Sequence, residues 1–151
     1  MRQNRKNESK NKDFRRIIAP VDGSKSSKHA FKKAIDLAKD TGIEVIALYV
    51  LEEPNNVYPG FSSMYPDAIN LMKKEGYSIL DEIKKMGSKI GIDVKIKLVI
   101  GHPDQEIIKM ARKDDLIVMG CKGQSALSEI LMGSVCQKVL HHSNSPVLMI
   151  R

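Results

Sequence analysis

Three glycines in the last third of the chain have the spacing of a ligand-binding loop. Gly120 ends the apolar run of residues 116–119, Gly123 follows after two residues, and Gly133 precedes Ser134, where a helical pattern begins. Glycine reaches backbone angles closed to other residues and lets a ligand approach the main chain. The N-terminus of a helix adds unpaired N–H groups and the positive end of the helix dipole. A strand, a glycine loop and a helix in this order predict an anion site, and phosphate is the usual anion.

Neither standard nucleotide fingerprint is present, because the chain has no G-x-x-x-x-G-K-[ST] loop and no G-x-G-x-x-G turn. The structural alternative is that the glycines only punctuate a loop, as a glycine after a strand often does. The glycine spacing, closed by Ser134, resembles the nucleotide-binding motif of the ATP-binding universal stress proteins. The resemblance extends over residues 14–151 and includes the segments 17–24 (IIAPVDGS) and 145–150 (SPVLMI).

This resemblance implies a set of ligand contacts. The glycine loop and the start of the last helix would hold phosphates and ribose, and the ends of the first two strands would line the adenine. Val50 would act through its backbone N–H and C=O, Met119 would flank the base or ribose, and Lys122 would either reach a phosphate or stay a solvated loop residue. The implied ligand is ATP, AMP or ADP, with Mg²⁺ held mainly by phosphates and water because no carboxylate cage is visible. The expected site residues are Pro20, Asp22, Val50, Met119, Gly120, Lys122, Gly123, Gly133, Ser134 and Val135.

Strand and helix patterns alternate along the chain, which predicts a five-stranded parallel open sheet with helices on both faces. The strand 94–100 alternates apolar and mostly basic residues and is expected at an edge, whereas the continuous apolar strands are expected inside. The strand order 3-2-1-4-5 satisfies this, and its winding reverses between the first and fourth strands, where such sheets bind ligands. The expected strands are 14–21, 44–51, 94–100, 116–119 and 147–150, and the expected helices are 26–41, 67–90, a short one after Pro103, and 134–142.

Residues 52–64 are rich in Pro, Gly, Asn and Ser and predict a long loop. Tyr58, Phe61 and Tyr65 lie in or beside it. We expect these rings to fasten the loop to the domain rather than to stack on a base.

Length and composition predict one domain without a membrane span. The 151 residues contain no run of 18 apolar side chains, residues 1–16 lack the apolar core of a secretory signal, and two cysteines make no disulfide framework. The chain is therefore expected in the cytoplasm. The net charge of +7 is concentrated in residues 1–16, which hold seven Lys/Arg against two Asp/Glu.

Residues 1–13 are expected to form a basic disordered tail before a nucleotide-binding domain of residues 14–151, since apolar side chains are almost absent from the tail. The domain has no basic stripe interleaved with aromatic residues, so nucleic acid is an unlikely partner.

The apolar last strand, 147–150, would be an exposed edge unless a second copy covers it. Antiparallel pairing about a two-fold axis would give a homodimer, as the resemblance also implies.

Catalytic candidates are few. His29, His102, His141 and His142 have no spacing typical of a metal site, and Ser125 and Ser128 have no adjacent base. Cys121 is expected to be a small loop residue, with a redox role as the alternative.

The resemblance favours an ATP-binding stress-response or signalling module with little or no turnover and an unknown partner. The alternative is a slow adenine-nucleotide hydrolase or phosphotransferase, which would need a positioned base or water-orienting group.

Overall fold

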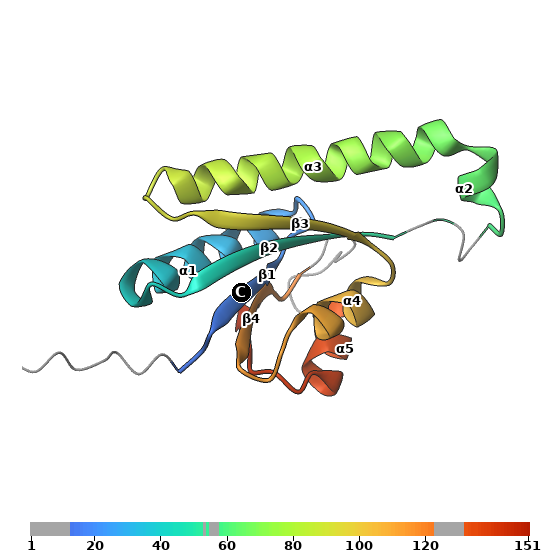
Figure 1. The fold of residues 1–151 in the computed structure, drawn as a ribbon. Helices are drawn as coiled ribbons and strands as arrows, with labels where there is room; N and C mark the ends of the chain where they lie inside the picture. The colour runs from blue at the N-terminus through green and yellow to red at the C-terminus, as the bar shows by residue number, and fades with distance from the viewer. Residues whose placement is uncertain (1–12, 53, 55–57, 123–131) are drawn as a thin grey trace, which may run out of the picture.

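Five parallel strands form one sheet at the centre of the molecule (Figure 1). The computed structural model describes residues 13–52, 54, 58–122 and 132–151. The strands are β1 Arg16–Pro20, β2 Glu44–Leu51, β3 Val94–Ile100, β4 Asp115–Gly120 and β5 Val147–Ile150. Their order across the sheet is β3-β2-β1-β4-β5, which confirms the predicted topology and places the alternating strand β3 at an edge.

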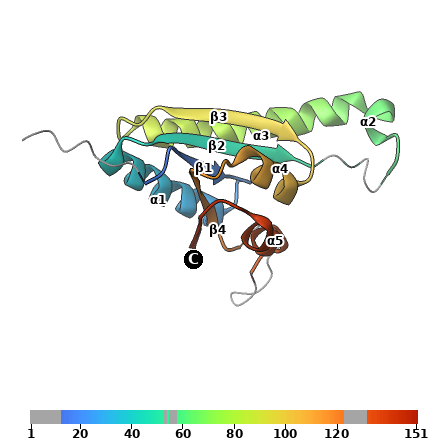
Figure 2. The same cartoon turned by 60° about the horizontal axis from the view of Figure 1, so that its bottom comes forward.

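Helices cover both faces of this sheet (Figures 1 and 2). The helices α1 (Lys25–Thr41) and α3 (Pro66–Ser88) pack on one face, and α4 (Pro103–Met110) and α5 (Ser134–His142) pack on the other. Along β1, Ile17 and Ala19 join the first apolar layer and Ile18 joins the second. A strand buried on both faces needs a continuous apolar run, as the sequence of β1 shows. None of the helices in the described residues is both long and apolar enough to cross a bilayer.

The ends of α1 are set by Ser24 and Gly42. The Ser24 hydroxyl accepts a hydrogen bond from the Ser27 N–H at 3.1 Å, which caps the helix. At the other end Gly42 adopts a left-handed conformation with φ 66°, and its N–H donates to the Ala38 carbonyl at 2.7 Å. Glycine adopts this conformation without the steric cost that a Cβ would add.

The long helix α3 approaches the sheet at its glycines. A Cβ at Gly76 would lie 2.7 Å from the Tyr49 ring and 2.8 Å from a methyl group of Leu98. A Cβ at Gly87 would meet the Val94 side chain and would lie 2.9 Å from the Ile92 carbonyl oxygen. Both glycines therefore permit a helix–sheet distance that a larger residue would increase.

Part of the segment predicted as a long loop is helical. A short helix, α2 (Phe61–Met64), precedes α3, and the rings of Phe61 and Tyr65 contact each other with centroids 5.0 Å apart. Tyr58 and Tyr65 are exposed, so the expectation that they fasten the loop to the domain is wrong for these two residues. Their environment is set by α2 and the start of α3, which project past the end of the sheet (Figure 1).

The two central strands β1 and β4 pair over only part of their length. β1 pairs with β2 at five positions, from Arg16 to Pro20, but with β4 at three, ending at Ile18 opposite Ile117. The neighbouring crossovers from β1 and β4 go to opposite faces of the sheet, so the strands are free to separate at their carboxyl ends.

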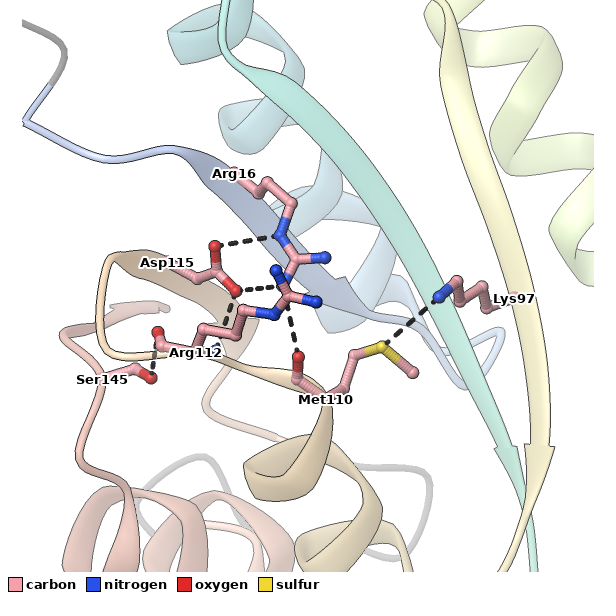
Figure 3. A network of polar contacts seen from close by, with 6 residues as sticks. All are labelled: Arg16, Lys97, Met110, Arg112, Asp115 and Ser145. Atoms are coloured by element: carbon pink, nitrogen blue, oxygen red, sulfur yellow. Dashed lines mark hydrogen bonds and ion pairs between the residues drawn. The ribbon is translucent and has the colours of Figure 1, made fainter.

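At their amino ends the same two strands are joined by an ion pair that the sequence analysis did not identify (Figure 3). The guanidinium of Arg16 contacts both carboxylate oxygens of Asp115, with Nε 3.0 Å from Oδ1. The Arg112 N–H donates to the same carboxylate at 2.8 Å. Burial alone would raise the pKa of Asp115, but these hydrogen bonds outweigh burial and lower it.

Candidate functional site

A pocket lies beyond the carboxyl ends of β1 and β4, where their pairing has stopped. Nine of the ten residues selected from the sequence line it: Pro20, Asp22, Val50, Met119, Gly120, Lys122, Gly133, Ser134 and Val135. The tenth, Gly123, lies outside the described residues, as do Ser125 and Ser128. Six further residues line the pocket that were not predicted from the sequence: Val21, Ser27, Leu48, Pro103, Ile107 and Cys136.

Two of the missed residues had a signal in the sequence. Leu48 is the partner of Pro20 in the β1–β2 register, so predicting the end of β1 could also have identified it. Ile107 is the buried residue of α4, the helix that closes the apolar side of the pocket. Ser27 had no comparable signal, because its role depends on how α1 approaches the strand end.

The backbone of Val50 faces the pocket. The Val21 N–H donates to the Leu48 carbonyl at 2.9 Å, so Leu48 directs its peptide groups toward β1. The Gly101 N–H donates to the Leu51 carbonyl at 3.0 Å, on the β3 side. Alternate residues of a pleated strand face the same neighbour. Val50 therefore faces the β1 side, two residues after Leu48, where β1 has already ended. This is the orientation that a backbone contact to a bound base requires.

Asp22 stands at the turn between β1 and α1. Its carboxylate oxygen Oδ1 accepts a hydrogen bond from the Ser24 N–H at 3.0 Å, and its own N–H donates to Ser27 Oγ at 3.3 Å. These bonds fix the entry into α1 and hold the side chain at the pocket wall. Asp22 thus has a structural role in addition to its position in the candidate site.

Gly120 is required by the packing of α1. A Cβ at this position would lie 2.8 Å from both the carbonyl carbon and the carbonyl oxygen of Ser26, and closer still to its hydroxyl. The same hydroxyl accepts a hydrogen bond from the Lys122 N–H at 3.3 Å. From the sequence, Gly120 was expected to allow a ligand to approach the main chain. Contact with α1 is sufficient to require glycine here, whether or not a ligand is bound.

The last helix presents its N-terminus to the pocket. Gly133 precedes α5, and its N–H donates to the Cys121 carbonyl at 2.8 Å, which joins the helix to the end of β4. No side-chain hydrogen bond caps α5 among the described residues, and its first turn contains no acidic residue. Gly133 has φ −61° and ψ 147°, angles open to any residue, so its backbone conformation does not explain the glycine.

Among the described residues, the charged groups that line the pocket are the carboxylate of Asp22 and the ammonium group of Lys122. Beyond the lining, Lys138 of α5 lies 3.9 Å from Asp104 of α4, and this pair connects the two helices on that face. Positive charge and helix N–H groups occur together on the α5 side of the pocket. That side is suited to an anion, and the side formed by Leu48, Val50 and Ile107 is suited to an apolar ring.

No three residues among His, Cys, Asp and Glu gather as a metal site in the part of the chain that is described. His29, His141 and His142 are exposed, and His102 lies 3.5 Å from Glu52 at the surface. Cys121 and Cys136 are both buried. Burial, followed by the neighbouring Cys121, raises the pKa of the Cys136 thiol to about 11.

These features define an α/β protein of the open-sheet class, with a pocket at the switch point of the strand order. The model of the universal stress protein family matches residues 13–151. The chain belongs to the universal stress protein family.

Individual relatives agree with this assignment. The chain is 36% identical to universal stress protein MJ0531 of Methanocaldococcus jannaschii over 140 residues, covering 91% of this chain and 82% of that protein. The solved structure of MJ0577, a protein of the same organism, is similar with a TM-score of 0.79 and 32% identity, covering 91% and 95% of the two chains. A universal stress protein from Archaeoglobus fulgidus, solved in complex with dAMP, shares the fold with a TM-score of 0.64 at 22% identity, covering 91% and 98%.

Proposed function

We propose that this protein binds an adenine nucleotide, ATP with Mg²⁺, in the pocket between β1 and β4, and that it acts as a stress-response or signalling module with little or no turnover. The main support is the convergence of nine residues, which the family resemblance implied as ligand contacts, on one pocket at the switch point. The dAMP complex of a structural neighbour supports an adenine nucleotide as the ligand class.

The two sides of the pocket suggest how the nucleotide is held. Adenine lies against Leu48, Val50 and Ile107, and the backbone of Val50 is available to its polar edge. The phosphates lie at the N-terminus of α5, close to Ser134 and Lys122, where several N–H groups and one cation can contact them. Mg²⁺ is bound through the phosphates and water. AMP and ADP fit the same arrangement with fewer contacts at the phosphate end.

A substitution at Ser134 tests the phosphate end selectively. An aspartate at the first position of α5 suits the helix dipole and leaves the fold intact, but it repels phosphate. We expect Ser134→Asp to weaken ATP binding at least about tenfold, which is about 1.4 kcal/mol. Adenosine binding should not change, and Ser134→Ala is the matched control without charge. Calorimetry with ATP and Mg²⁺ measures both, and equal ATP affinity in the wild type and Ser134→Asp would contradict this placement of the phosphates.

Gly123, which lies outside the described residues, provides a second test from the sequence motif. We expect Gly123→Val to lower ATP affinity by about 2 kcal/mol, or about thirtyfold. Lys122→Ala should have a smaller effect because the Lys122 side chain is only half-buried, and salt screens a charge that solvent reaches.

Turnover is measured separately. We expect ATP hydrolysis far below the median of enzymes, which is about 10 s⁻¹. A metal-dependent rate near that median, abolished by one point mutation that leaves binding intact, would instead establish an enzyme.

A further inference from the structure

A second cavity, of about 220 Å³, lies at the amino ends of β1, β2 and β4, whereas the candidate nucleotide pocket lies beyond carboxyl ends of the sheet. Each described residue of its lining carries a charge, and these residues are Arg15, Arg16, Glu44, Arg112, Asp114 and Asp115. Walls of this kind do not suit an apolar ligand, because the charged groups would lose water without gaining a partner. The cavity therefore suits a small charged ligand.

Two of the three carboxylates in this lining have a cation of their own. Asp115 contacts Arg16 through both carboxylate oxygens, and the Glu44 carboxylate contacts the ammonium group of Lys95. These four side chains bind one another in two pairs. Contacts to a ligand are therefore expected from the other three lining residues.

Those three residues, Arg15, Arg112 and Asp114, have exposed side chains. Within the described part of the chain, none of them forms an ion pair. Figure 3 shows the Arg112 side chain extending from the turn before β4 toward the pair of Arg16 and Asp115. The lining thus has two guanidinium groups and one carboxylate that are available to a ligand.

Hydrogen bonds of the main chain fix the positions of these three residues. The Arg15 N–H donates to the Asp114 carbonyl at 2.8 Å, and the Arg112 N–H donates to the Asp115 carboxylate at 2.8 Å. The Arg112 carbonyl accepts hydrogen bonds from the Asp115 N–H at 2.8 Å and from the Ser145 hydroxyl at 2.9 Å. Since these bonds use main-chain atoms of the two arginines, their guanidinium groups can be replaced without breaking them.

We propose that this cavity binds inorganic phosphate, with Arg15 and Arg112 donating to its oxygens and Asp114 accepting a hydrogen bond from its P–OH group. The planar guanidinium group matches phosphate oxygens through paired N–H···O bonds. Inorganic phosphate keeps a proton on one oxygen at neutral pH, whereas sulfate has none and a phosphate monoester loses its last proton with a pKa of about 6. An ionised carboxylate only accepts hydrogen bonds, so Asp114 favours the anion that still carries a proton. This site does not rest on the proposed function.

The test is an NMR titration of the full chain with sodium phosphate at constant ionic strength, followed at the arginine Nε–H signals. The signals of Arg15 and Arg112 should shift and saturate with one dissociation constant. Arg112→Gln, followed at Arg15, should weaken binding about tenfold because it removes charge-assisted hydrogen bonds. Lys113→Gln is the matched control, since it removes the same charge from an exposed neighbour that does not line the cavity. It should change the affinity by less than about twofold, because salt screens that charge.

The role of Asp114 is tested by the choice of anion. In the wild type, sulfate should bind at least about tenfold more weakly than phosphate, and so should glycerol 3-phosphate at about pH 8, where its monoester group has lost both protons. Asp114→Asn removes the negative charge and supplies an amide donor. Its affinities for phosphate and sulfate should therefore lie within about twofold of each other.

Three results would overturn the proposal. The first is the absence of a saturable shift at Arg15 and Arg112, and the second is an equal loss of affinity in Arg112→Gln and Lys113→Gln, which would mean general charge attraction. The third is equal binding of phosphate and sulfate by the wild type. A shift confined to the Ser134 N–H would place phosphate in the nucleotide pocket, which would overturn this site and support the proposed function.

Circular dichroism checks the fold of each variant. Arg112→Lys repeats the test if Arg112→Gln does not fold. It keeps the charge but loses the paired N–H geometry, so it should also weaken phosphate binding, by at least about threefold. Unchanged affinity in Arg112→Lys would overturn the paired contact.

Discussion

Replacing Gly120 by alanine is expected to destabilise the protein even when no nucleotide is present. The added Cβ would lie 2.8 Å from the carbonyl carbon and oxygen of Ser26, which belong to the main chain of α1. A side chain could rotate away, but these atoms move only if the start of α1 moves away from β4. Overpacking of a well-packed core typically lowers the free energy of unfolding by about 1–3 kcal/mol. Because the added Cβ of Gly120→Ala meets the main chain, we expect a loss at the upper end of this range, about 3 kcal/mol.

The assay is thermal unfolding of the nucleotide-free protein, followed by circular dichroism. For a domain of this size about 1 kcal/mol changes the melting temperature by about 2–4 °C, so Gly120→Ala should lower it by about 6–12 °C. Gly42→Ala is a control, because no atom lies within 4 Å of the added Cβ and only the left-handed backbone is unfavourable, by about 1–2 kcal/mol. The double variant Ser26→Ala/Gly120→Ala removes the hydroxyl but keeps the main-chain contact, so most of the loss should remain. A melting temperature of Gly120→Ala equal to that of the wild type, or full recovery in the double variant, would refute the reasoning.

Three other predictions concern the rest of the molecule. Asp115→Asn should lower the free energy of unfolding by about 3 kcal/mol at neutral pH, because it leaves Arg16 partly buried without its partner. The pKa of Asp115 is lowered in the folded state, so this stabilisation is present above the unfolded pKa of about 3.9 and is lost as the pH falls through the folded value. In urea unfolding, the free energies of unfolding of the variant and the wild type should therefore converge in acid. A difference that stays constant with pH would contradict the ion pair. The protein should form a homodimer through β5, so Leu148→Lys should give a monomer in sedimentation at micromolar concentration. Ile100→Lys, on the other edge strand, is the matched control and should stay dimeric. The two side chains are similarly exposed, at 42% for Leu148 and 40% for Ile100. Deletion of residues 1–12 should leave the melting temperature and the ATP affinity nearly unchanged, and a loss of several degrees would show that this segment packs on the domain.

The fold was predictable from the sequence because periodicity and topology rules act on whole elements. The continuous apolar runs of β1 and β4 and the alternation of β3 were sufficient for the strand order. The first strand, expected over residues 14–21, is shorter in the structure and ends at Pro20, which lacks the N–H of an interior strand residue. The position of the pocket followed from that order, since the direction of winding reverses between β1 and β4.

The parts that sequence reasoning missed depend on contacts between distant residues. Asp115 was assigned to the connection before β4, but its partner Arg16 lies 99 positions away and no local pattern connects them. Gly120 was assigned to ligand approach because the position of Ser26 becomes known only when α1 is packed on β4. The exposure of Tyr58 and Tyr65 likewise depends on α2, a helix too short to give a periodic signal.

The pairing of β1 with β4, which are almost 100 residues apart in the sequence, also has a consequence for the growing chain on the ribosome. β1, α1 and β2 leave the ribosome early, but the residues that pair with the other side of β1 come about 100 positions later. At a synthesis rate of about 5–20 residues per second, the strand at the centre of the finished sheet is an unpaired edge for about 5–20 s. That edge carries Ile17 and Ile18, and an apolar unpaired strand is a template for aggregation. The nascent chain therefore exposes an apolar strand edge until β4 emerges, and the pocket is complete only after α5 has followed it.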